Sequence, residues 1–176
     1  MADSSHILLV GIGSPHGDDQ IGWRVADELV AALSKRDRQE WLDTWRIHKA
    51  KSPLDLLNWL EADSRGPVRH LIICDACQSA SSPADICAGA IHCWSWPDEE
   101  LPSVRFSGSH DLGLAAVLHL ARALDRLPPR IDIWGVEVDR LERATDLSSQ
   151  LKRTPALVAR RIRESTAMNE LPVSWI

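Results

Sequence analysis

A short apolar stretch that runs directly into a glycine turn places the strongest constraint on how this chain can fold. Residues 7–10, Ile-Leu-Leu-Val, are continuously apolar and partly β-branched, which is typical of a strand covered on both faces. Gly11 and Gly13 then let the backbone turn sharply. Beyond the turn, apolar residues recur every four positions, close to one stripe of a helix: Ile21, Val25, Leu29 and Leu33. The opening of the chain therefore predicts a strand, a glycine turn and a helix, in that order.

Strands and helices alternate along the rest of the chain. Mostly apolar runs predict further strands at residues 45–50, 69–75, 90–96 and 131–138. Apolar spacing and helix-start signals such as Ser52-Pro53 and Thr154-Pro155 predict helices at residues 53–61, 114–124 and 154–164. Residues 78–89 are too few and too rich in Ser, Pro and Gly for a crossover helix, so we expect the fourth strand to run antiparallel. The alternation predicts a three-layer α/β/α sandwich in a single domain, residues 1–176.

Length and charge exclude several classes of protein. A chain of 176 residues can bury a core without metal or disulfide staples, and a formal net charge of −5 argues against nucleic-acid binding. We expect the cationic cluster Arg160, Arg161 and Arg163 to be the solvated side of the last helix. No segment has the roughly twenty apolar residues of a membrane helix, and the N-terminus lacks the positive charge of a secretory signal. We therefore expect a cytoplasmic protein with neither a membrane nor a nucleic-acid partner.

Three chemically active side chains are expected at one edge of the sheet. Asp19 follows the first strand, Asp75 ends the third, and His110 lies at the entrance of the helix after the fourth. In open α/β sheets, functional groups collect beyond the carboxyl ends of the strands, because loops and helix N-termini converge there. Two carboxylates and one imidazole suit a divalent first-row metal such as nickel or zinc, with positions left open for substrate or water. Asp18, beside Asp19, is expected to support such ligands from outside the coordination sphere.

Each of these residues also has a purely structural interpretation. Asp18 or Asp19 could complement the positive end of the first helix. Asp75 could cap a loop, and His110 could be a histidine that only starts a helix. The shared edge of the sheet favours the functional interpretation.

The cysteines and the glycine turn offer two competing kinds of site. Cys74 and Cys77 form a CxxC pair followed by Cys87 and Cys93, and four thiolates can hold a structural zinc ion. This interpretation is weak because Cys74 lies inside an apolar strand, and free cysteines are often small buried apolar groups. A phosphate-binding loop is also disfavoured, because His16 replaces the third glycine and the adjacent carboxylates would repel a pyrophosphate.

Four segments resemble the motifs of the hydrogenase maturation proteases, the endopeptidases that trim the C-terminal tail of the large-subunit precursor of nickel-iron hydrogenases. The opening motif is GIGSPHGDDQIG, and the strand-end aspartate with a downstream proline lies in IICDACQSASSPAD. The Ser-x-His segment is SGSHDLGL, and WGVEVDRLERATDLS is similar to the late Gly-hydrophobic-Glu strand. The resemblance spans nearly the whole chain and rests on the order and spacing of the segments together.

This resemblance has consequences for fold, site and function. It implies an α/β/α sandwich with a mostly parallel five-stranded sheet in which one strand is antiparallel. It implies that Asp19, Asp75 and His110 are the metal-contacting and catalytic residues, the same three that the sheet edge selects. It further implies an endopeptidase that acts on the precursor after nickel insertion, with the precursor's nickel as recognition signal rather than as a tightly held cofactor. Residues 76–88 and 97–109 are expected to form the walls of the substrate cleft.

Two other functions remain open at this point. The protein could be a nickel-dependent docking module that binds the precursor without cleaving it. It could also be a free-standing zinc metallohydrolase, with the zinc held by the cysteines. Cleavage of the precursor separates the first alternative from the protease, and the metal content of the purified protein tests the second.

Overall fold

The structure of the protein is a computed structural model that describes residues 5–34, 43–61, 66–78, 87–97, 101, 105–106, 113–139 and 145–170. Its strands are β1 (His6–Ile12), β2 (Trp45–Ala50), β3 (Val68–Gln78), β4 (Ile91–Trp96), β5 (Arg105–Phe106) and β6 (Arg130–Glu137). Its α-helices are α1 (Ile21–Leu33), α3 (Leu114–Ala123) and α4 (Thr154–Glu170). Two short 3-10 helices complete the described elements: η1 (Gly17–Gln20) and η2 (Pro53–Asn58).

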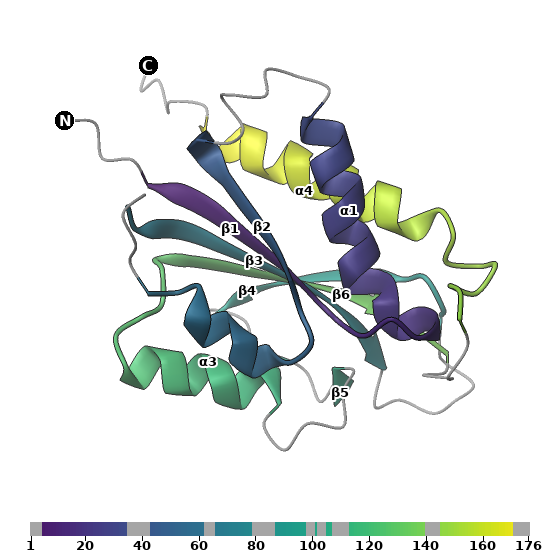
Figure 1. The fold of residues 1–176 in the computed structure, drawn as a ribbon, viewed down its shortest axis with the longest axis horizontal. Helices are drawn as coiled ribbons and strands as arrows, with labels where there is room; N and C mark the ends of the chain where they lie inside the picture. The colour runs from purple at the N-terminus through teal and green to yellow at the C-terminus, as the bar shows by residue number, and fades with distance from the viewer. Residues whose placement is uncertain are drawn as a thin grey trace.

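The strands form one mixed sheet in the order β2-β1-β3-β6-β4 (Figure 1). Strand β1 pairs in parallel with β2 and β3, and β3 pairs in parallel with β6. Strand β4 runs antiparallel to β6 and forms one end of the order. The predicted mostly parallel, five-stranded arrangement with one antiparallel strand is confirmed for this order, and the two-residue strand β5, which pairs antiparallel with β3 beside it, adds a sixth strand. The expectation rested on the length and composition of the connection before β4.

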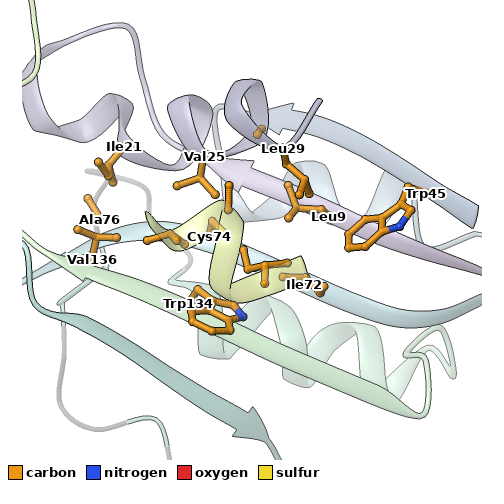
Figure 2. Close-up of a cluster of buried hydrophobic side chains, with 14 of the residues drawn as sticks. Leu9, Ile21, Val25, Leu29, Trp45, Ile72, Cys74, Ala76, Trp134 and Val136 are labelled. Carbon is orange, nitrogen blue, oxygen red and sulfur yellow. The ribbon is translucent and has the colours of Figure 1, made fainter. Parts of the chain in front are cut away.

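Helices cover both faces of the sheet (Figure 1). Helices α1 and α4 contact each other over one face, while α3 and η2 contact each other over the opposite face. The four apolar residues that predicted a helical stripe on α1 are all buried beneath it. Figure 2 shows this layer, in which Ile21, Val25 and Leu29 lie over side chains of β1, β3 and β6. A second apolar layer, which includes Leu8, Ile73 and Leu118, fills the space between the sheet and α3.

Several predicted boundaries were wrong. The helix expected at residues 53–61 is the 3-10 helix η2, in which Trp59 N donates to Leu56 O at 3.0 Å. Its start was predicted correctly, because Ser52 and Asp55 form a reciprocal capping box. The last helix continues beyond residue 164 to Glu170, and the two-residue strand β5 was not predicted. The expected solvated side of α4 is confirmed for Arg160 and Arg161, which are exposed, whereas Arg163 is half-buried.

A cluster of polar side chains closes the amino end of β3 and β6. Asp132, which is buried, accepts hydrogen bonds from Arg130 Nη2 at 2.7 Å and from Ser95 Oγ at 3.3 Å. His70 Nε2 lies 2.9 Å from the same carboxylate. Burial raises the pKa of Asp132, but the hydrogen bonds and charges of His70 and Arg130 outweigh burial and hold that pKa below its usual value. The buried negative charge of Asp132 at this end of the sheet is therefore compensated by His70 and Arg130.

None of the described helices is both long and apolar enough to cross a membrane.

Candidate active site

The two expected carboxylates are positioned at the carboxyl edge of the sheet. Asp19 lies in η1, directly after the glycine turn, and η1 contacts β3. Asp75 lies in β3 opposite Gly135 of β6 and is completely buried. The expectation that Asp75 ends its strand was wrong, because β3 continues to Gln78. Cys77 pairs with β6 and with β5, and this pairing extends β3 beyond Asp75. The periodicity of the sequence does not predict such pairing between distant segments.

Glycines bring the start of α1 against the strands. A Cβ atom on Gly22 would collide with the carbonyl oxygens of Ile12 and Cys74, the residue before Asp75. A Cβ atom on Gly11 would collide with the carbonyl oxygen of Gly22. Both positions therefore have to be glycine for the helix to lie this close to the sheet. The close approach sets where η1, with its two aspartates, lies relative to β3.

The adjacent aspartates of η1 have different environments. Asp18 Oδ1 accepts a hydrogen bond from the backbone N–H of Ser148 at 2.7 Å, which ties η1 to the segment before α4. Gln20 adds to this tie, since its Nε2 donates to Thr145 O at 3.2 Å. Asp19 Oδ1 is shielded from solvent and has no hydrogen-bond partner among the described residues. Of the two aspartates, Asp18 therefore holds a neighbouring segment, while Asp19 has a shielded oxygen that no described residue satisfies.

His110 lies outside the described residues, so the structure does not test its place beside the two carboxylates. Strand β5, which ends four positions earlier at Phe106, pairs with Cys77 and Gln78 at the carboxyl end of β3. Helix α3 begins four positions later at Leu114. Within the described part of the chain, no group of three His, Cys, Asp or Glu side chains is arranged to hold a metal ion. The proposed set of Asp19, Asp75 and His110 stays a prediction.

The described cysteines are poorly suited to bind zinc. Burial, with a smaller contribution from Asp75, raises the pKa of Cys74 far above its usual range. Burial raises the pKa of Cys77 to about 12, and the carboxylates of Asp75 and Glu137 act in the same direction. A zinc ligand has to be a thiolate, so both environments oppose the form that the metal needs. Cys87 and Cys93 are exposed.

A third buried carboxylate, Glu137, was not assigned a role from the sequence. It ends β6 and is 4% exposed, and its Cα pairs in register with that of Cys77. Its Oε2 atom lies 3.5 Å from Nε2 of His92, while Oε1 is buried without a hydrogen-bond partner in the described part of the chain. The sequence signal that could have identified Glu137 is an acidic residue at the end of an otherwise apolar strand. The same signal identified Asp75.

The expected cleft walls, residues 76–88 and 97–109, lie largely outside the described residues. A surface hollow of about 560 Å³ is present between α1 and the start of α4. Its lining comes from α1, the segment before α4, and α4: Arg24, Glu28, Asp146, Leu147, Ser149, Lys152 and Pro155. The hollow borders the segment that Asp18 holds, and it contains neither Asp19 nor Asp75.

Comparison with solved structures defines the class of fold: the chain has the fold of the hydrogenase maturation proteases, in agreement with the resemblance of its motifs. The endopeptidase HybD from E. coli superposes with a TM-score of 0.68 at 20% identity, covering 94% of each chain. HybD from Thermococcus kodakarensis gives 0.64 at 20% identity, covering 92% of this chain and 99% of the other. The maturation protease HycI from the same organism gives 0.62 at 18% identity, covering 91% of each chain. No family model and no curated protein sequence matches the chain.

Proposed function

We propose that this protein is an endopeptidase that removes the C-terminal peptide of a nickel-iron hydrogenase large-subunit precursor after nickel has been inserted. The observation that carries the proposal is a shared fold over more than nine-tenths of the chain with proteins named as hydrogenase maturation proteases. The alignment of Asp19 and Asp75 with one sheet edge supports the same function, because parallel α/β sheets carry their functional groups there.

The environments of the two carboxylates favour a cationic substrate. Asp75 is completely buried, and Asp19 has one shielded oxygen without a hydrogen-bond partner among the described residues. Burying a negative charge is costly unless a positive charge compensates it. Nickel carried by the precursor would supply a positive charge beside the shielded oxygen of Asp19, so a metal-loaded precursor would bind more tightly than one without metal.

In this proposal the chain's own residues orient the substrate. Asp19 and Asp75 would bind the precursor's nickel through carboxylate oxygens, and His110 would add an imidazole nitrogen, a set suited to a divalent first-row ion. Asp18 would keep η1 in place through Ser148 rather than touch the substrate. Binding the metal next to the scissile peptide would couple cleavage to completed nickel insertion.

The test is a cleavage assay with purified protein and purified large-subunit precursor, loaded with nickel or free of it. Mass spectrometry of the products should show a shortened chain only for the loaded precursor. Asp19→Asn and Asp75→Asn should abolish nickel-dependent cleavage, because each removes a negative charge at the proposed contact. The matched control is Asp27→Asn on the exposed side of α1, which should cleave like the wild type.

The assay also separates the alternatives. Binding of the loaded precursor without any shortened product would identify a docking module and overturn the proposed peptidase activity. Stoichiometric zinc in the freshly purified protein, lost in Cys77→Ser and retained in Asp19→Asn, would identify a zinc hydrolase instead.

A further inference from the structure

We propose that His92, oriented by the buried carboxylate of Glu137, is the proton carrier for peptide cleavage at this edge of the sheet. The inference rests on the proposed peptidase function and adds two residues to it. Neither the motifs nor the comparisons assign a role to this pair.

The sheet register places His92 in the same row as Asp75. Asp75 of β3 pairs with Gly135 of β6, and Gly135 pairs with His92 of β4. Paired residues in neighbouring strands point to the same face, so Asp75 and His92 flank Gly135 on one side of the sheet. Cys74 and Ala76, the neighbours of Asp75, belong to the apolar layer beneath α1, which identifies the shared face as the α3 side.

The space that Gly135 leaves between Asp75 and His92 is occupied by neighbouring side chains. A Cβ atom on Gly135 would lie 2.7 Å from the Trp94 indole and 2.9 Å from Cys77 Sγ. The imidazole of His92 stacks on this same indole, with 5.5 Å between ring centroids and 13° between ring planes. Because Gly135 has no side chain, the Trp94 indole can lie over it, and stacking on this indole fixes the plane of the His92 ring.

Glu137 supplies the second constraint on the imidazole. Its side chain is 6% exposed, whereas that of His92 is 43% exposed, so the pair joins a buried charge to an open ring. Glu137 Oε2 lies 3.5 Å from His92 Nε2. A carboxylate at this position favours the tautomer with a proton on Nε2, which leaves the lone pair on Nδ1 for a substrate. Catalytic contacts of this kind are often long before substrate binds.

A second histidine-carboxylate pair, His70 and Asp132, does not meet these requirements. Both of its side chains are buried, at 7% and 6% exposure, and it lies at the amino end of the sheet. Arg130 and Ser95 also donate to that carboxylate. The pair of His70 and Asp132 is therefore inaccessible to a substrate and has a structural role. In the pair of His92 and Glu137, by contrast, the imidazole is exposed and lies at the edge of the sheet where the site is expected.

The proposed step is a balanced hydrolysis. Neutral His92 takes a proton from a water molecule through Nδ1, and the resulting hydroxide forms a bond with the scissile carbonyl carbon. The protonated imidazole, stabilised by Glu137, then gives that proton to the leaving nitrogen as the C–N bond breaks. One water is consumed, one carboxyl group and one amine are released, and His92 returns to its neutral form. His92 would be a catalytic residue and Glu137 a positioning residue.

The test uses the full-length protein and the nickel-loaded precursor in the cleavage assay, with kcat and KM measured separately. His92→Phe keeps a ring to stack on Trp94 but has no nitrogen, and His92→Ala opens space for added imidazole. Both should lower kcat by about 100-fold or more with little change in KM, since general acid-base catalysis contributes factors of this size. Imidazole in the buffer should restore part of kcat to His92→Ala but not to His92→Phe.

Two further variants complete the experiment. Glu137→Gln should lower kcat more than Glu137→Asp does, because only the aspartate keeps the charge that stabilises the imidazolium. His119→Ala is the matched control, since His119 also contacts a tryptophan, Trp96, but from α3 near the other end of the sheet. It should keep wild-type kcat and show no response to imidazole.

The outcomes separate this inference from the proposed function. Wild-type kcat in either His92 variant, or a loss in His92→Ala that imidazole does not reduce, overturns the role of His92 while leaving the peptidase function intact. Failure of the wild-type protein to cleave the loaded precursor overturns both.

Discussion

At the scale of single residues, the shielded carboxylates among the described residues differ in how their negative charge is met. Asp132 is surrounded by His70, Arg130 and Ser95, which satisfy its negative charge. Asp19 and Glu137 each keep a buried oxygen without a hydrogen-bond partner among the described residues. A satisfied buried charge contributes to stability, whereas an unsatisfied one is retained at a cost that function explains better than folding does.

Asp132→Asn tests the satisfied charge. Removing the negative charge leaves the Arg130 guanidinium without its charged partner, so we expect the free energy of unfolding to fall by about 3 kcal/mol at neutral pH. Denaturant titration followed by circular dichroism measures the loss. Asp27→Asn, which removes an exposed partner of Lys49, should change the stability by less than about 1 kcal/mol. Equal effects of the two substitutions would contradict the distinction.

The same carboxylate predicts a pH dependence. The pKa of Asp132 is lower in the folded protein than in the unfolded chain, so its contribution is fully present above the unfolded value of about 4. The contribution is lost as the pH falls below that value toward the folded-state pKa. The stability difference between wild type and Asp132→Asn should therefore shrink in acid. A difference that grows below about pH 4 would contradict this sign.

At the scale of elements, the junction of β1 with α1 positions the candidate site. Gly11 and Gly22 let the two backbones touch, and Gly22 also faces the carbonyl of Cys74 in β3. The start of helix α1 thus contacts both β1 and β3. Asp19 lies three residues before Gly22 in the chain, and Asp75 directly follows Cys74. The element that carries Asp19 depends on this junction for its position.

Gly22→Ala tests the junction. The added Cβ would meet backbone carbonyls that cannot move independently of the strands, so we expect a loss of about 3 kcal/mol in unfolding free energy. Gly113→Ala is the matched control, because nothing lies within 4 Å of a Cβ at that position and its φ is −70°. Thermal melting of the two variants makes the comparison. A Gly22→Ala protein as stable as Gly113→Ala would show that the contact is looser than described.

At the scale of the whole molecule, two apolar layers enclose the sheet and divide the cysteines into two groups. Cys74 and Cys77 are 1% and 2% exposed, because both lie in β3 between the helix layers. Cys87 and Cys93 are exposed, and Cys93 lies on β4 at one end of the strand order. Reactivity of the thiols therefore reports whether the whole sandwich is closed.

We expect a thiol-specific reagent to modify Cys87 and Cys93 in the native protein and all four cysteines in denaturant. Burial keeps the other two thiols from the reagent, and the raised pKa of Cys77, about 12, keeps that thiol protonated at neutral pH. Mass spectrometry after brief labelling identifies the modified positions. Cys87→Ser and Cys93→Ser should each remove one fast-reacting thiol. Rapid labelling of Cys74 in the native protein would contradict the closed layers.

Much of the fold could be predicted from the sequence because its signals are local. The apolar stretch at residues 7–10, the stripe on α1 and the capping residues at Ser52 and Asp55 act through near neighbours in the chain. The extension of β3 to Gln78 and the short β5 could not be predicted in this way, since both depend on pairing between distant segments. For the same reason, the buried state of Asp75 was not visible from its position near the predicted strand end.

The sequence itself determined the order of strands and helices and the antiparallel fourth strand, through periodicity, glycine placement and connection length. It also identified the candidate carboxylates Asp19 and Asp75. Tertiary structure alone decided which carboxylates are satisfied and which keep a shielded oxygen without a partner among the described residues. It also placed His92 across Gly135 from Asp75 and beside Glu137. The physical reason is that strand register sets these distances, and register is fixed only when segments remote in the chain pair and bury their side chains together.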